Sequence, residues 1–214
     1  MSDFYAKEGK FIIENNEVHV NDFLDLKSKY KNMEFLPLFK QIVTMFEIDT
    51  YVELGVRKGY TFNNIAPFVK KAIAVDIGDM RSIVQSHNVV KIQSKTDDLA
   101  LKWNEPIDFL FIDADHRKEQ AMRDFDNFSK FVRVGTGIIA MHDTHPIDQR
   151  LLSDDNCSSA WQVADAISRR TKEYYNKFEI FTFPGPFAGL SLIRKRRHHL
   201  AWGVVSDDDW DKWG

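Results

Sequence analysis

The sequence predicts an α/β fold built on a doubly wound, largely parallel sheet. Apolar runs and helix-like segments alternate from residue 50 onward. The apolar runs are continuous rather than alternating, which is typical of parallel strands buried on both faces. A polar or acidic residue follows several of these runs, at the strand end where such sheets bind ligands. We therefore expect one main domain with a ligand site along one edge of its sheet.

Each element follows from a local pattern in the chain. Residues 10–20 are expected to form a β-hairpin turned at Asn15 and Asn16, followed by a short helix capped by Asn21 or Asp22. A broad apolar face predicts a helix over 33–47, and Thr61 is the expected cap of a later one. The remaining strands are expected at 50–54, 72–77, 89–93, 107–112, 137–141, 178–183 and 189–194, and the remaining helices at 61–70, 80–85, 97–102, 117–132 and 158–172.

The last two predicted strands have no room for a helix between them. Only residues 184–188 separate them, so they should pair as a hairpin. This places an antiparallel edge on an otherwise parallel sheet.

Composition excludes several classes of protein. The chain has 214 residues, 43% of them hydrophobic, which is enough for one sizeable core. The formal net charge of −3 lacks the basic footprint of a nucleic-acid binder. The one cysteine, Cys157, allows no internal disulfide, which favours a reducing, cytoplasmic setting. The N-terminus lacks an apolar signal core, and no apolar run is long enough to span a membrane.

The chain divides into three parts by pattern. Residues 1–47 are expected to form an N-terminal cover or oligomer segment, 48–195 the main domain and 196–214 a C-terminal tail. The basic run 194–199 and the acidic run 206–211 favour a solvated tail over a polyanion contact. Three tryptophans near these runs indicate docking on a surface such as a second subunit, so a homo-oligomer is one expectation.

Residues 51–61 carry the pattern of a nucleotide site, in which a strand ends in an acid and turns through glycines into a helix. Gly55 lets the backbone approach a ligand closely, and Gly59 allows tight passage into the helix. Asp76, at the end of the next strand, suits the two hydroxyls of a ribose. Glu53 would repel a pyrophosphate but attract a cationic amino-acid head group. The loop therefore favours S-adenosylmethionine over NAD.

These segments resemble the class I S-adenosylmethionine-dependent methyltransferases. The matching pieces are 52–59, 74–76, 107–113 and the closing hairpin, and the resemblance covers about 48–194. It implies a Rossmann-like, seven-stranded sheet with an antiparallel last strand. It also implies a division of the cofactor among these residues: Glu53, Gly55 and Gly59 for the methionine moiety, Asp76 for the ribose, and Ser94 to Asp97 for the adenine.

Two polar clusters follow the fourth and fifth strands of the predicted sheet. The first contains Asp113, Asp115 and His116, and the second contains His142, Asp143 and His145. Adjacent parallel strands lie about 4.8 Å apart, so the two clusters can converge. Oxygen ligands suit Mg²⁺, while imidazoles would allow Mn²⁺, Fe²⁺ or Zn²⁺. The alternative is structural, since polar residues are common at strand ends and a histidine there can bind only backbone.

The order of these residues resembles the macrocin O-methyltransferase and cephalosporin-hydroxylase-like group. That resemblance implies a divalent metal, with Mg²⁺ favoured, held by Asp113, His142 and Asp143. The position of His142 is commonly acidic in the group, so the histidine is a departure. The resemblance also implies that His116 is the general base beside Asp113, with Asp115 and His145 as second choices for orienting it.

The combined interpretation is a metal-assisted O-methyltransferase that acts on a hydroxyl of a sugar or small metabolite. Two alternatives stay open at this point. One is an NAD-linked oxidoreductase, which the loop pattern disfavours. The other is a non-catalytic binding protein that has kept the fold. The polar loop 148–157 is a candidate lid over the site.

Overall fold

The structure is a computed structural model. It describes residues 35–147, 149–154, 156–169, 174, 177–184 and 188–196, with the backbone of three short strands between residues 5 and 19. Its main sheet has seven strands in the order β6-β5-β4-β7-β8-β10-β9. Strands β6 to β8 of this order pair in parallel, and β10 runs antiparallel to both of its neighbours. The predicted fold class is therefore confirmed, including the closing hairpin.

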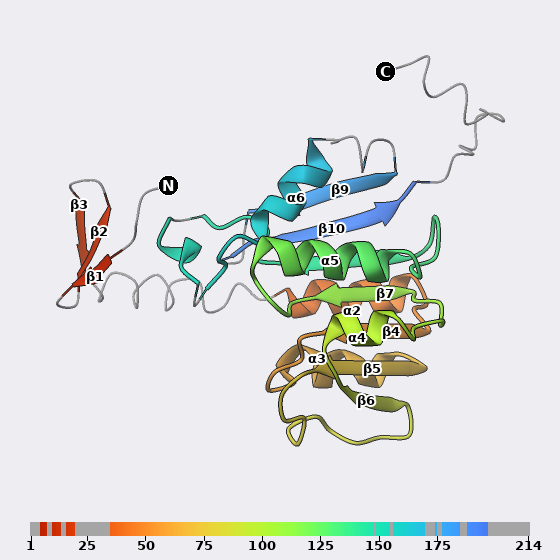
Figure 1. The fold of residues 1–214 in the computed structure, drawn as a ribbon. Helices are drawn as coiled ribbons and strands as arrows, with labels where there is room; N and C mark the ends of the chain where they lie inside the picture. The colour runs from red at the N-terminus through yellow and green to blue at the C-terminus, as the bar shows by residue number, and fades with distance from the viewer. Residues whose placement is uncertain are drawn as a thin grey trace, which may run out of the picture.

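The elements follow the predicted order closely (Figure 1). The strands of the main sheet are β4 (Thr50–Leu54), β5 (Lys71–Asp76), β6 (Val89–Gln93), β7 (Phe109–Ile112), β8 (Ile138–His142), β9 (Phe178–Phe183) and β10 (Leu190–Lys195). The helices are α2 (Leu36–Met45), α3 (Tyr60–Ile65), α4 (Thr96–Ala100), α5 (Lys118–Ser129) and α6 (Trp161–Ser168), with 3₁₀ turns η1 (Ala66–Phe68) and η2 (Gln149–Leu152).

Two helix predictions differ from the structure. The expected helix over 80–85 is absent, because Asp79 accepts a hydrogen bond from the backbone N–H of Arg81 at 2.9 Å and favours a turn. Helix α3 ends early, since Pro67 supplies no backbone N–H and the chain continues as the 3₁₀ turn η1. Gly59 takes the capping position of α3 in a left-handed conformation, and Thr61 is buried in its first turn.

Side chains of the main sheet alternate between two apolar layers. One layer joins alternate strand residues to α2 and α3, and its members include Phe39, Tyr51 and Phe111. The other joins the intervening strand residues to α5 and α6, and its members include Leu110 and Phe125. Figure 1 shows α2 and α3 behind the sheet and α4, α5 and α6 in front of it. Both faces of the sheet are thus covered, as its continuous apolar strands require.

The N-terminal region contains a separate three-stranded sheet of β1 (Tyr5–Lys7), β2 (Lys10–Ile13) and β3 (Asn16–His19). The predicted hairpin is confirmed, because β2 and β3 pair antiparallel from Lys10 opposite His19 to Ile13 opposite Asn16. The predicted helix after residue 21 and the tail beyond Arg196 lie outside the described residues. The division of the chain at residues 47 and 195 stays a prediction. No helix in the described ranges is long and apolar enough to cross a membrane.

Helix α2 packs directly on the sheet through Phe39, which is fully buried. Its ring meets the rings of Phe109 and Phe111 edge-on, with centroids 5.0 and 4.9 Å away. We expect Phe39→Ala to lower the free energy of unfolding by about 3–5 kcal/mol, because it opens a cavity between helix and sheet. Phe46→Ala, just beyond the same helix and 55% exposed, should change it by about 0.5 kcal/mol or less. Urea unfolding of both variants tests the packing, and equal losses would contradict it.

Candidate functional site

A cavity of about 1430 Å³ lies along the carboxyl ends of the parallel strands. Residues that leave β4, β5, β6, β7 and β8 contribute to its wall, together with parts of α5 and of the segment that follows β8. Of the predicted site residues, Gly59 is not among those that line it. The ones that do are Glu53, Gly55, Asp76, Ser94, Asp97, Asp113, His116, His142 and Asp143.

The loop after β4 depends on two glycines with left-handed backbone. Gly55 has a φ of +88°, and a Cβ on it would lie 2.3 Å from the carbonyl oxygen of Asp113. Gly59 has a φ of +75°, and a Cβ there would lie 2.4 Å from Cδ1 of Ile83. The loop is therefore pressed against the start of the segment that follows β7. A side chain at 55 would push these two walls of the cavity apart, and one at 59 would displace Ile83.

Glu53 is a buried acid at the base of the cavity, with 2% of its surface exposed. The hydroxyl of Tyr51 donates a hydrogen bond to its Oε2 at 2.5 Å. Burial raises the pKa of Glu53 well above its usual range, and the charges of Asp113 and Asp76 raise it further, although the bond from Tyr51 opposes the shift. A cation that binds beside such a buried carboxyl stabilises its ionised form.

Asp76 is held by the backbone on both of its oxygens. The N–H of Arg57 donates to Oδ2 at 2.7 Å, and the N–H of Gly78 donates to Oδ1 at 2.7 Å. The backbone N–H of Ser94 donates to the carbonyl of Asp76 at 2.9 Å, which brings the ends of β5 and β6 together. The carboxylate is thus fixed in the cavity wall, with lone pairs left for a ligand.

The two polar clusters after β7 and β8 converge at one end of the cavity. His142 Nδ1 lies 3.2 Å from both Asp113 Oδ1 and Asp143 Oδ1. His116 lies between the same two carboxylates, with Nδ1 3.1 Å from Asp143 Oδ2 and Nε2 3.7 Å from Asp113 Oδ1. The arrangement therefore supplies two acids and two imidazoles at one point.

The carboxylates shift the pKa of each histidine upward. A hydrogen bond to Asp113 raises the pKa of His116 to about 9, burial opposes this, and the charge of Asp143 adds to it. Burial disfavours the charge on His142, but Asp113 and Asp143 together raise its pKa well above the usual value. Burial likewise works against the charge of Asp113, whose pKa is nevertheless lowered by the two imidazoles. In the absence of a metal ion these groups stabilise one another as ion pairs.

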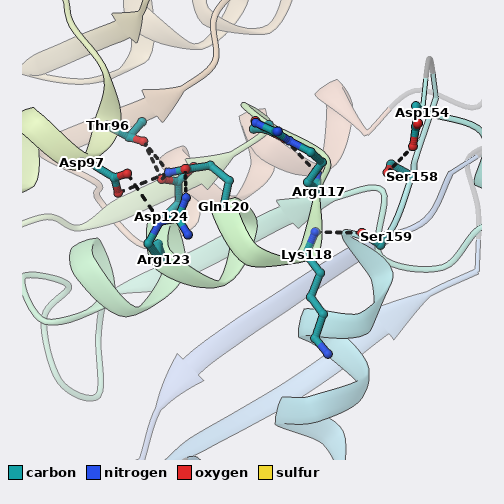
Figure 2. Close-up of polar contacts among 11 residues, drawn as sticks. Thr96, Asp97, Arg117, Lys118, Gln120, Arg123, Asp124, Asp154, Ser158 and Ser159 are labelled. Carbon is teal, nitrogen blue, oxygen red and sulfur yellow. Dashed lines mark hydrogen bonds and ion pairs between the residues drawn. The ribbon is translucent and has the colours of Figure 1, made fainter.

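His116 is oriented by the segment that follows η2. Its Nδ1 makes a short contact with the carbonyl oxygen of Asn156, and its own carbonyl accepts a hydrogen bond from the N–H of Ser159 at 3.1 Å. The hydroxyl of Ser159 also accepts the N–H of Lys118 at the start of α5, at 2.8 Å (Figure 2). With Nδ1 directed at a carbonyl oxygen, the tautomer with its proton on Nδ1 leaves Nε2 open to the cavity.

The two second-choice residues have other partners. Asp115 is bound by its neighbour Arg117, whose Nη2 donates to Oδ2 at 2.5 Å, and this bond lowers the pKa of Asp115. His145 is exposed, does not line the cavity, and donates its backbone N–H to the carbonyl of Ala188 at 3.0 Å. In the described part of the chain, neither residue forms a hydrogen bond or ion pair with the side chain of His116.

Sequence patterns missed a third polar group in the cavity wall. Thr96 from α4 and Gln120 and Asp124 from α5 are hydrogen-bonded together beside Asp97, as Figure 2 shows. Asp124 is fully buried, and burial raises its pKa. The sequence does place two polar residues, 120 and 124, one turn apart on the predicted helix. Polar residues on such a helix are expected to face water, so the pair does not by itself indicate a site.

Comparison with known families identifies the central part of the chain. Residues 52–144, which hold most of this cavity wall, match the family described as a methyltransferase domain. The match indicates a methyltransferase domain in this part of the chain. The predicted resemblance is therefore confirmed at the level of this domain, while the ligand that each cavity residue contacts stays a prediction.

Solved structures of low sequence identity share the fold of this methyltransferase domain. One is an O-methyltransferase from Bacillus cereus in complex with SAH, with a TM-score of 0.60 and 14% identity over 83% of this chain and 90% of that one. Another is the O-methyltransferase TomG from Streptomyces achromogenes, involved in tomaymycin synthesis and in complex with SAM. Its TM-score is 0.57, with 12% identity over 91% of this chain and 92% of that one. Both comparisons support the order of strands described above.

The raised pKa of His116 predicts how the stability of the metal-free methyltransferase domain depends on pH. The stabilisation is fully present below about pH 6.5, the pKa of an unfolded histidine, and is lost as the pH rises through the folded value of about 9. We expect His116→Gln to flatten this decline by roughly 1–2 kcal/mol, after allowing for the one-third of the ring that is exposed.

Urea unfolding in EDTA across this range measures the effect. His87→Gln makes the same change at an exposed histidine outside the cavity and should leave the decline unchanged. A parent protein whose stability does not fall over this window would contradict the ion pairing.

Proposed function

We propose that the protein transfers the methyl group of S-adenosylmethionine to a hydroxyl oxygen of a sugar or another small metabolite, assisted by a divalent metal ion. The observation that carries the proposal is one continuous cavity. It joins the buried Glu53 and Asp76 to the convergent group Asp113, His116, His142 and Asp143. A methyl donor and a proton acceptor can therefore be held side by side, as an in-line methyl transfer requires.

Charge indicates which end of the cavity would bind the methyl donor. Glu53 at the glycine loop would pair with the ammonium of the methionine moiety, whose positive charge favours the ionised carboxylate. Asp76 would receive the ribose hydroxyls, and residues 94–97 would lie along the adenine. Gly55 and Gly59 act by keeping side chains out of the loop, so that the backbone can pass close to the ligand.

The reacting end fits a divalent cation. Asp113, His116 and Asp143 each offer one ligand atom, and these atoms lie within 4.8 Å of one another. His142 Nδ1 contacts both carboxylates as well, but the three ligand atoms that lie close together include His116 in place of the predicted His142. A bound cation would offset the two carboxylates, lower the pKa of the neighbouring histidine and lower the pKa of the acceptor hydroxyl.

His116 is the proposed general base. Its Nδ1 faces the carbonyl of Asn156, so Nε2 is the nitrogen that can take the proton. The hydroxyl oxygen then forms a bond to the methyl carbon while the bond from that carbon to sulfur breaks, and S-adenosylhomocysteine leaves. A pKa of about 9 keeps His116 protonated at neutral pH, which argues that positive charge beside Asp113 and Asp143 is needed before the base can work.

An oxygen acceptor is favoured over nitrogen by the similar structures, two of which are O-methyltransferases. A hydroxyl also needs both the base and the charge that this end of the cavity offers, because its own pKa is high. The cytoplasmic setting and a homo-oligomeric state remain predictions of the sequence.

Cofactor binding tests the role of Glu53. We expect S-adenosylhomocysteine, but not NAD, to raise the melting temperature of the parent protein. Glu53→Gln should weaken that binding by about tenfold or more, since it removes a charged hydrogen-bond partner of the ammonium. Asp98→Asn, an exposed acid outside the cavity, is the matched control and should bind normally.

Calorimetry also measures whether ligand binding releases a proton. Because burial raises the pKa of Glu53 in the free protein, binding of the cationic ligand should release a proton that Glu53→Gln does not release. Titrations in two buffers of different ionisation enthalpy measure that proton. Tight binding of NAD, or unchanged binding of S-adenosylhomocysteine by Glu53→Gln, would refute the assignment.

The two histidines have different expected roles. His116→Ala should lower kcat by about 10²–10⁴ and leave metal affinity nearly unchanged, because it removes the base. His142→Ala should weaken metal binding, and added metal should restore part of its activity. Metal titration and single-turnover methyl transfer measure both effects. If His116→Ala loses the metal and His142→Ala does not, the two roles are exchanged.

A further inference from the structure

The polar group of Thr96, Asp97, Gln120 and Asp124 in the cavity wall joins two helices. Thr96 and Asp97 begin α4, while Gln120 and Asp124 lie one turn apart on α5, and all four line the cavity. Figure 2 shows their side chains turned toward one another. Asp124 has none of its surface exposed, and its Oδ2 has no hydrogen-bond partner among the described residues.

The direction of each hydrogen bond in this group is fixed by chemistry. A carboxylate oxygen that takes two hydrogen bonds accepts both, so the hydroxyl of Thr96 donates to Asp124 Oδ1 at 2.5 Å and Gln120 Nε2 donates to it at 2.9 Å. The same Nε2 lies 3.3 Å from Asp97 Oδ1 and 3.2 Å from Thr96 Oγ1. Arg123 donates to the side-chain oxygen Oε1 of Gln120, and this contact fixes which way the side-chain amide is turned.

The side-chain donors of this group are therefore directed inward. The hydroxyl of Thr96, the amide of Gln120 and the guanidinium of Arg123 all end on oxygens within the group, and Arg123 Nε lies 3.4 Å from Asp97 Oδ2. What remains for the cavity is lone pairs on Asp97 and on Thr96, because the unpartnered oxygen of Asp124 is buried. The side chains of this wall thus offer acceptors only.

We propose that Asp124 is a positioning residue which, by fixing the hydroxyl of Thr96 and the amide of Gln120, makes this wall specific for a purine with a 6-amino group. This rests on the proposed binding of S-adenosylmethionine. With the methionine moiety at Glu53 and the ribose at Asp76, the base reaches residues 94–97 and this wall. An amino group donates to the acceptors there, whereas the carbonyl oxygen of a 6-oxo purine would face carboxylates.

Asp124→Leu tests the positioning because it removes the acceptor while keeping a similar shape. The hydroxyl of Thr96 and the amide of Gln120 then lose the oxygen that holds them and are free to turn into the cavity and pair with a 6-oxo group. The probes are S-adenosylhomocysteine and S-inosylhomocysteine, which carries the 6-oxo group. The parent should prefer the first by about 100-fold or more. Asp124→Leu should lower that ratio by about tenfold or more, and calorimetry of both ligands measures it.

Two further variants separate positioning from a general loss of structure. Thr96→Val keeps the shape but removes the hydroxyl, so the preference should fall, whereas Thr96→Ser keeps the hydroxyl and should retain it. These variants decide the question if Asp124→Leu does not fold. An unchanged ratio in Asp124→Leu or in Thr96→Val overturns the role of Asp124 and leaves the proposed function standing. A parent protein that binds neither ligand overturns the proposed function, and the inference with it.

Discussion

The close approach of Gly55 to the backbone of Asp113 and Ala114 is the constraint on which the site depends. A Cβ at residue 55 would lie 2.3 Å from the carbonyl oxygen of Asp113 and 2.5 Å from Cα of Ala114. Strands β4 and β7 are neighbours in the sheet, and their loops leave it in contact. The glycine loop and the backbone that carries the Asp113 carboxylate are therefore packed directly against each other. Any ligand held over the loop lies beside Asp113 without further adjustment.

The cavity gathers negative charge before any ligand binds. Glu53, Asp76 and Asp113 share one wall, and the latter two each raise the pKa of Glu53. Two histidines offset Asp113 at one end, whereas among the described residues the hydrogen-bond partner of the Glu53 carboxyl is the hydroxyl of Tyr51. Both proposed ligands, a sulfonium amino acid and a divalent cation, are positive. Binding at either end relieves repulsion at the other, so the two should bind cooperatively through the charge of Asp113.

The sequence predicted the parts of this structure that rest on short-range rules. Continuous apolar runs located the parallel strands, and the ends of β5 and β7 placed Asp76 and Asp113 at one edge of the sheet. The prediction failed where a local side-chain hydrogen bond competes with a helix, as at Asp79, whose carboxylate stabilises a turn. It missed Asp124 because burial of a helix residue depends on what packs against it. Only the contact of α5 with Thr96 shows that this face is closed from water.

Most of the strained non-glycine backbone positions among the described residues lie around the cavity. Among the described residues, left-handed backbone at non-glycine positions occurs at Glu47, Arg57, Asp143 and Ser158, and the last three line the cavity. Such conformations cost about 1–3 kcal/mol each unless the surroundings enforce them. At Asp143, with a φ of 59°, the chain turns immediately after β8, and its carboxylate meets both His116 and His142. A relaxed backbone there would aim the acid elsewhere, so the packing of the sheet sustains a local strain that keeps the convergent group together.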